Sequence, residues 1–278
     1  MKLTVTIDKQ MWNVVISEPI DLSIALDFYG PQPSAFSLAE ASSAPVSAGS
    51  FVGDTRLGGS ANCETISLNP HANGTHTEGV GHISLERYAV SEALCDSLIP
   101  ATVITVQPEI FGESSESYDG ISCGEDRVIT RRQLSDALKK LGYSPGFMDA
   151  VIVRTLPNAT TKMQAHHSGS NPVYFTNDAM KWVCEANIRH VLVDIPSVDR
   201  EEDGGKLSNH RIFWDLAHGQ SIDLARKHAT ITEMIYVPER VEDGVYLLNL
   251  QIPNFVLDAA PSRPVLFRLQ PEKTAFNS

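Results

Sequence analysis

Residues 69–84 read NPHANGTHTEGVGHIS, and they gather three of the nine histidines of the chain around one acidic residue. Because alternate residues of an extended strand point to one side, His76 and Glu78 would face the same way. The interspersed glycines let the backbone bend so that nearby side chains converge. The candidate ligands in this stretch are His71, His76, Glu78 and His82.

Imidazole and carboxylate groups suit divalent metals such as zinc and manganese. The stretch contains neither HExxH nor a Cys-x-x-Cys pair, so it has no standard zinc spacing. Residue chemistry alone leaves two interpretations open, a metal site or surface histidines in a glycine-rich loop. Distant partners would be His210 and Glu233, of which Glu233 lies inside the apolar run ATITEMIYV. Such a glutamate is either exposed on an edge strand or an interior ligand or base.

The remaining histidines have weaker support as ligands. The neighbours His166 and His167 are expected in a surface loop or lid. The others have no supporting neighbours and are expected to be exposed to solvent; they are His190, His218 and His228.

Composition limits the class of protein. The chain has 278 residues, 42% of them hydrophobic, and a net charge of −12. This acidity argues against a nucleic-acid or anionic-membrane partner, because phosphate binding needs clustered Lys and Arg. No run of apolar residues is long enough for a transmembrane helix, and the N-terminal alternation indicates a strand rather than a signal peptide. We therefore expect a cytoplasmic protein, with its four cysteines as buried free thiols.

Hydrophobic patterning predicts a mixed α/β domain over 1–278. The clearest helix covers 130–142, where Thr130 and Gln133 have capping-box spacing and Gly142 ends the helix. Further helices are expected at 176–187, capped by Thr176 or Asn177, and around 212–216. Residues 37–50 are expected to form a long loop. The expected strands are a hairpin in 3–17 and segments 63–68, 82–88, 101–110, 147–156, 188–199, 229–237, 244–252 and 263–269.

The sequence GTHTEGVGH at 74–82 resembles the HxGTHxDxPxH signature of the cyclase family, which includes bacterial kynurenine formamidase and isatin hydrolase. The resemblance extends over about residues 15–270 and includes five further segments. They are DLSIAL at 21–26, DAVIVRT at 149–155, VDIPSVD at 193–199, NHRIFW at 209–214 and ITEMI at 231–235.

The resemblance implies a swivelling β/β/α fold with one or two divalent metals, zinc or manganese, and hydrolysis of formamides or cyclic amides. His76 matches the second histidine of the signature, Glu78 the metal-bridging aspartate, and His82 the general acid/base. His210 and Glu233 match the later metal ligands. A metal-activated water would attack the carbonyl while His82 moves the proton to the leaving nitrogen.

This chain departs from the signature at several places. The position of the first family histidine is Ala72, with His71 one residue too early, and a one-residue bulge would deliver His71 to the metal. Glu78 replaces an aspartate, Val80 replaces a proline, and residues 215–229 look like an insertion. These changes indicate a divergent member of the family.

Several expectations concern the surroundings of the site. Thr75 and Ser197 would support it from outside the ligand set, or make local turn hydrogen bonds. Ring contacts to an aromatic or cyclic amide substrate would come from an N-terminal loop, although core packing is the alternative for these side chains: Phe28, Tyr29 and Phe36.

Two other functions stay open. One is a non-catalytic metal-binding or ligand-binding protein on the same fold, and the other is a lactone or ester hydrolase. The resemblance also implies a homodimer or homotetramer, with residues 30–60 as a contact.

Overall fold

A large mixed sheet forms the centre of the computed structural model, which describes residues 1–142 and 144–272. Four parallel, almost fully buried strands make its middle, as expected when both faces of a sheet are covered. They are β9 (Leu98–Val106), β12 (Ala150–Thr155), β14 (His190–Val193) and β15 (Thr230–Glu233). Antiparallel strands extend the sheet on both sides: β16 (Gly244–Asn249) and β18 (Val265–Pro271) on one, β8 (His76–Glu78) and β17 (Ala259–Pro261) on the other. The expected α/β fold is confirmed.

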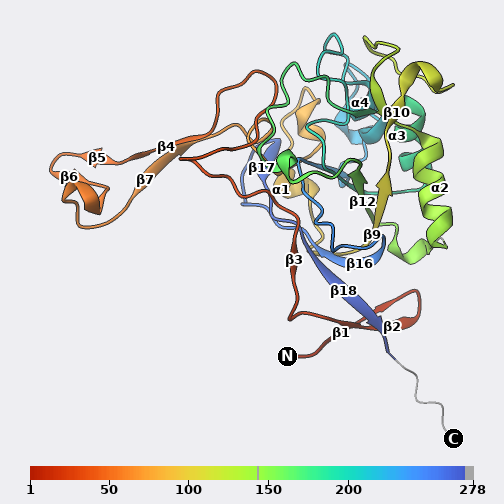
Figure 1. Cartoon of the computed structure of the whole chain (residues 1–278), viewed down its shortest axis with the longest axis horizontal. Coiled ribbons are helices and arrows are strands. Elements are labelled where there is room, and N and C mark those ends of the chain that lie inside the picture. The colour runs from red at the N-terminus through yellow and green to blue at the C-terminus, as the bar shows by residue number, and fades with distance from the viewer. Residues whose placement is uncertain (143, 273–278) are drawn as a thin grey trace, which may run out of the picture.

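Helices cover one face of this sheet (Figure 1). Side chains of β12 alternate between the faces: Val151 and Val153 pack among the helices, and Ile152 packs in a second core on the opposite face. The covering helices are α2 (Arg131–Leu141), α3 (Asn177–Glu185) and α4 (Ser208–Trp214). The capping box of Thr130 and Gln133 is present, and Thr176 caps α3, so both clear helix predictions are confirmed.

Shorter elements complete the chain. An N-terminal hairpin of β1 (Leu3–Ile7) and β2 (Gln10–Val14) extends the sheet edge beyond β18. The other strands are β3 (Ile20–Asp21), β4 (Ser42–Pro45), β5 (Ser47–Ala48), β6 (Phe51–Val52), β7 (Glu64–Ser67), β10 (Glu109–Ile110), β11 (Arg127–Ile129) and β13 (Tyr174–Phe175). The helical turns are η1 (Thr55–Leu57), η2 (Val80–His82), α1 (Val90–Ala93), η3 (Phe111–Glu113), η4 (Pro145–Phe147), η5 (Thr160–Gln164) and η6 (Ile222–Leu224).

Two segments differ from their predictions. Residues 82–88 are not a strand, because the chain turns through η2 and Gly81 passes under Tyr88, whose carbonyl oxygen would lie 2.1 Å from an added Cβ. Residues 37–50 are not simply a loop, since β4 pairs with β7 and β5 with β6. These four strands and η1 form an arm, residues 42–67, which projects from the body (Figure 1).

Burial of cysteine and histidine also differs from expectation. Cys63, Cys95 and Cys123 are exposed on the arm and in loops, and only Cys184 is half-buried, so the cysteines are free but mostly not buried. His190 is fully buried rather than exposed, because it begins a central strand and its Nδ1 contacts Thr230 Oγ1 at 2.9 Å. His218 and His228 are exposed, as expected.

No helix in the described ranges is long and apolar enough to cross a membrane.

Candidate metal centre

The strand pairing of β8 builds the centre. This strand lies between β15 and β17, and its antiparallel register places His76 opposite Glu233. His76 and Glu78 have the same parity and share the face of the site, whereas Thr77 between them bonds Thr232 Oγ1 at 2.8 Å. Glu233 is 2% exposed and lies in an interior strand, so the edge-strand alternative is wrong.

Met234 explains why β15 stops at Glu233. Its φ of 51° turns the chain out of the strand immediately after the glutamate. Thr75 fixes this turn, since its hydroxyl donates to Met234 O at 2.5 Å and accepts from Ile24 N at 2.9 Å. Thr75 thus contacts backbone beside the centre rather than a ligand side chain.

Glu78 occupies the middle of the cluster and is fully buried. His210 Nε2 lies 2.9 Å from its Oε1, while His71 Nδ1 and His82 Nε2 lie 3.1 and 3.9 Å from its Oε2. Glu233 is beside them, with its Oε2 3.5 Å from His76 Nε2 and its Oε1 3.9 Å from His210 Nε2. The structure therefore brings together all six residues singled out in the sequence.

Several polar atoms of this cluster are buried without hydrogen bonds. They are both carboxylate oxygens of Glu78 and the Nε2 atom of His76, which have close neighbours but no acceptable hydrogen-bond geometry. In the described part of the chain, the ion pairs of Glu78 and Glu233 are all with histidines. Since a buried anion without a partner is costly, this donor set fits a divalent cation among its atoms.

The pKa shifts of the cluster show strong coupling between its carboxylates and its imidazoles. Burial raises the pKa of Glu78, but the His82 and His210 rings outweigh it and hold that pKa well below its usual range. Burial likewise lowers the pKa of His71, yet the Asp258 and Glu78 carboxylates raise it to about 10.

His71 reaches the cluster by a tight turn and not by a β-bulge. Ala72 and Asn73 both donate their backbone N–H to Asn69 O, at 3.1 and 3.0 Å. The Asn73 side chain closes the turn by accepting from Asn69 N at 2.7 Å. The extra residue is accommodated in this turn, and Ala72 packs in the interior.

Asp199, the last residue of the segment VDIPSVD, has a role that the sequence pattern did not reveal. Asp199 Oδ2 lies 2.6 Å from His210 Nδ1, so the ring turns its other nitrogen, Nε2, toward Glu78. Its two oxygens also accept from the backbone N–H groups of Asn209 and His210 at the start of α4. A carboxylate behind a ligating imidazole is the usual signal of such a support.

Asp258 is the second residue that the sequence reasoning missed. Its Oδ2 lies 2.9 Å from His71 Nε2 and 3.3 Å from His82 Nδ1. It stands alone among apolar and small residues far along the chain, so no local pattern could have found it.

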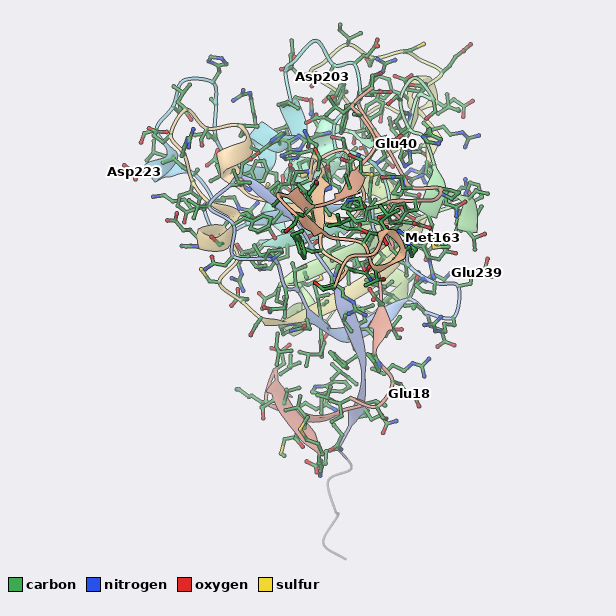
Figure 2. The ribbon with its side chains drawn as sticks, turned by 90° about the vertical axis from the view of Figure 1, so that its left-hand side faces the viewer. Glu18, Glu40, Met163, Asp203, Asp223 and Glu239 are labelled. Carbon is green, nitrogen blue, oxygen red and sulfur yellow. The ribbon has the colours of Figure 1, made fainter. Side chains whose placement is uncertain are left out.

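A cavity of about 680 Å³ opens in front of the cluster. Its inner wall contains Glu78 and Glu233, and apolar side chains form much of the rest: Phe36, Leu38, Ile121 and Leu207. The acidic segment 201–203 also lines it. Figure 2 shows Asp203 and Glu40, a close chain neighbour of Leu38, toward the same end of the molecule, with Glu18 and the N-terminal hairpin at the other.

The remaining candidates lie in different places. Phe36 lines the cavity, but Phe28 and Tyr29 are not among the described residues that do so. Tyr29 is 69% exposed and donates to Glu64 Oε1 on the arm at 2.5 Å. Ser197 lines the cavity, and its Oγ accepts from Asp199 N at 3.1 Å, the local turn bond. His166 is exposed and contacts Ser34 Oγ at 2.8 Å, outside the cluster.

Comparison with known proteins identifies similar chains. The family described as putative cyclase matches residues 1–200. A predicted metal-dependent hydrolase from Bacillus stearothermophilus is 18% identical, with a TM-score of 0.56 over 90% of this chain and 98% of the other. Isatin hydrolase A from Labrenzia aggregata, bound to benzyl benzoate, is 16% identical, with a TM-score of 0.59 over 90% and 93%. Isatin hydrolase A from Ralstonia solanacearum is 12% identical, with a TM-score of 0.59 over 90% and 91%. No curated protein matches the chain.

Proposed function

Because the chain belongs to the putative cyclase family, we propose that it is a metal-dependent hydrolase that cleaves the amide bond of a formamide or cyclic amide. The observation that carries this proposal is the buried Glu78 carboxylate, whose oxygens lack hydrogen bonds among three imidazoles. A carboxylate surrounded by imidazole nitrogens is a ligand set for zinc or manganese.

The donor atoms divide into two groups that share Glu78. His71, His76 and Glu78 would hold one divalent ion. His210 and Glu233 would hold a second ion with Glu78, or tighten the first. Asp199 fixes the His210 ring, so its Nε2 is already directed at the centre.

The proposed chemistry is hydrolysis. A bound divalent metal supplies a Lewis acid that lowers the pKa of water toward 7 and polarises a carbonyl. His82 is a partly exposed imidazole at the cavity wall, and it would move a proton from water to the leaving nitrogen.

The cavity also supports a choice of substrate. Phe36 and the aliphatic side chains offer contacts to a ring, and the acidic segment 201–203 disfavours anions. Two of the structural relatives are isatin hydrolases, which is consistent with a cyclic amide. We therefore propose a neutral or cationic aromatic or cyclic amide as substrate.

A substrate screen tests the proposal. Aryl formamides, cyclic amides and lactones would be incubated with the protein as purified, after removal of metal by a chelator, and after addition of zinc or manganese. We expect amide hydrolysis that chelation abolishes and metal restores, and that His82→Asn lowers by about 100-fold or more. Hydrolysis of lactones alone would show that the protein is a lactone or ester hydrolase instead of an amide hydrolase. Metal binding without hydrolysis of any of these compounds would favour the binding protein.

The oligomer is a further part of the proposal. The arm is a two-stranded ribbon, and an isolated two-stranded ribbon is marginally stable in water. It carries exposed apolar side chains, including Leu57 and Ile66. We propose that a second copy of the chain covers it in a homodimer or homotetramer. The cytoplasmic location stays a prediction, to be tested by cell fractionation.

A further inference from the structure

Asp258 holds two histidines of the centre through one oxygen atom. His71 Nε2 and His82 Nδ1 lie 2.9 and 3.3 Å from its Oδ2. The two rings stack beside each other, with centroids 4.3 Å apart and planes tilted by 31°. On their other side, each ring faces the same Oε2 atom of Glu78. Each imidazole therefore lies between an outer carboxylate, Asp258, and an inner one, Glu78.

The hydrogen-bonding capacity of these groups fixes where the ring protons are. An ionised carboxylate only accepts, and a neutral imidazole has one N–H and one lone pair. If both rings donate to Asp258, their N–H groups are His71 Nε2 and His82 Nδ1. Their lone pairs, on His71 Nδ1 and His82 Nε2, then both point toward Glu78. That is the tautomer in which His71 can ligate a cation and His82 can take a proton.

Backbone hydrogen bonds and strand pairing fix the position of Asp258. Its carbonyl accepts from Gly79 N at 3.0 Å, and the preceding Leu257 carbonyl accepts from Val90 N at 2.7 Å. The next residue, Ala259, pairs with Glu78 across the β8–β17 ladder. Gly81 in η2 lies beside Asp258, since a Cβ added at Gly81 would be in ordinary contact with Asp258 Cβ at 3.4 Å.

Asp258 is also placed to stay charged. Its side chain is 40% exposed and lines a separate hollow of about 290 Å³ behind the centre, together with Arg87 and Tyr88. It does not line the large cavity in which Glu78 and His82 lie. It thus contacts the two rings from outside the large cavity, at a place that solvent reaches.

We propose that Asp258 is a positioning residue that sets the tautomer and orientation of His71 and His82 together. It thereby couples metal binding at His71 to proton transfer at His82. This inference rests on the proposed function, in which His71 is a ligand and His82 the acid/base.

The test compares Asp258→Asn with Asp96→Asn. Asp96 is a matched control, because its side chain is 38% exposed, lies 3.6 Å from a histidine nitrogen (His190 Nε2) and belongs to no part of the centre. Zinc affinity would be measured by competition with a chelator. We expect Asp258→Asn to bind zinc about 10- to 100-fold more weakly, the usual loss for such a support, and Asp96→Asn to bind as the wild type.

Two further readouts separate positioning from other roles. At saturating zinc, Asp258→Asn should keep the wild-type number of ions per chain and lose kcat by about 10-fold or more with little change in KM. Imidazole nitrogen NMR should show His82 protonated at Nδ1 in the wild type and shifted toward Nε2–H in Asp258→Asn. Asp258→Glu should recover part of the affinity.

Each contrary outcome is decisive. If Asp258→Asn loses an ion at saturating zinc, Asp258 is itself a metal ligand. If Asp258→Asn keeps both the zinc affinity and the His82 tautomer of the wild type, Asp258 is not a positioning residue. The NMR comparison is made with and without added zinc, so it can also be read in the metal-free chain. If the wild-type protein binds no metal and hydrolyses none of the compounds, the proposed function is wrong. The His82 tautomer, compared between the wild type and Asp258→Asn, would still test the role of Asp258.

Discussion

Glu78 is the residue on which the centre depends, because its buried oxygens face three imidazole rings and no hydrogen bond satisfies them. Its identity was visible in the sequence, since parity placed it beside His76. The sequence also shows that a glutamate, with its longer side chain, stands where the family signature has an aspartate. What could not be read was the tight turn that delivers His71, which depends on the Asn73 side chain and on the packing of Ala72.

Replacing Glu78 by glutamine should remove the metal with little change in shape. Zinc at 100 times its Kd should stabilise the wild type by about 2.7 kcal/mol, by mass action, and Glu78→Gln hardly at all. The measurement is the free energy of unfolding with and without zinc. Glu239→Gln, an exposed glutamate labelled in Figure 2, is the control and should respond as the wild type does. Equal stabilisation of Glu78→Gln would place the metal elsewhere.

His190 should make stability depend on pH. Burial, with help from the nearby Arg189 charge, lowers the pKa of His190 from 6.5 to about 4. Between these values the unfolded chain binds a proton that the folded chain excludes, so stability is complete above pH 6.5 and falls as the pH is lowered. The contribution lost between pH 7 and pH 5 is roughly 2 kcal/mol.

Denaturant unfolding at the two pH values measures this loss. His190→Leu should lose less stability than the wild type on going to the lower pH, by about the amount given above. His218→Gln, which changes an exposed histidine, should follow the wild type. An identical pH dependence in all three proteins would show that His190 titrates normally.

Helix α2 shows what the sequence determines at the scale of an element. Its cap residues and terminal glycine are all local, and the structure has them as predicted. The strand predicted at 82–88 is wrong for the opposite reason. Its β-like alternation is overridden by the turn η2 and by the close crossing at Gly81, which are tertiary features.

Removing the cap of α2 should destabilise the protein. Thr130 Oγ1 accepts from Gln133 N, and Gln133 Oε1 accepts from Thr130 N at 3.1 Å. Thr130→Ala should therefore lower the free energy of unfolding by about 1 kcal/mol. Lys140→Ala, an exposed change in the same helix, should have an effect within about 0.5 kcal/mol. Equal effects of the two changes would mean that the cap does not stabilise the helix.

At the scale of the whole molecule, the sheet brings together residues that the chain keeps apart. The order of the predicted strands could not be read from their patterns, because it depends on long-range pairing. Hence the sequence could offer Glu233 and His210 as distant partners, from their local setting and from family resemblance, but could not place them beside Glu78. It could not propose Asp258 at all. The arm was missed because β4 pairs with β7 across the eighteen intervening residues 46–63, many of them small or polar.

The arm should control the oligomeric state. Leu57 and Ile66 are 68% and 56% exposed, so burial against a second copy would stabilise an oligomer. Light scattering should give a dimer or tetramer for the wild type and smaller species for Leu57→Asp combined with Ile66→Asp. Leu224→Asp, at a site 73% exposed outside the arm, is the control and should keep the wild-type mass. A monomeric wild type would contradict the proposed assembly.

The central claim is that this cluster binds a catalytic divalent metal, and elemental analysis tests it most directly. Metals per chain would be measured by mass spectrometry for the purified wild type, His76→Ala and His218→Ala, each before and after addition of zinc or manganese. We predict one or two ions in the wild type and His218→Ala, and a loss of at least one ion in His76→Ala. A wild type that takes up no metal, or a His76→Ala variant that keeps its full complement, would contradict the claim.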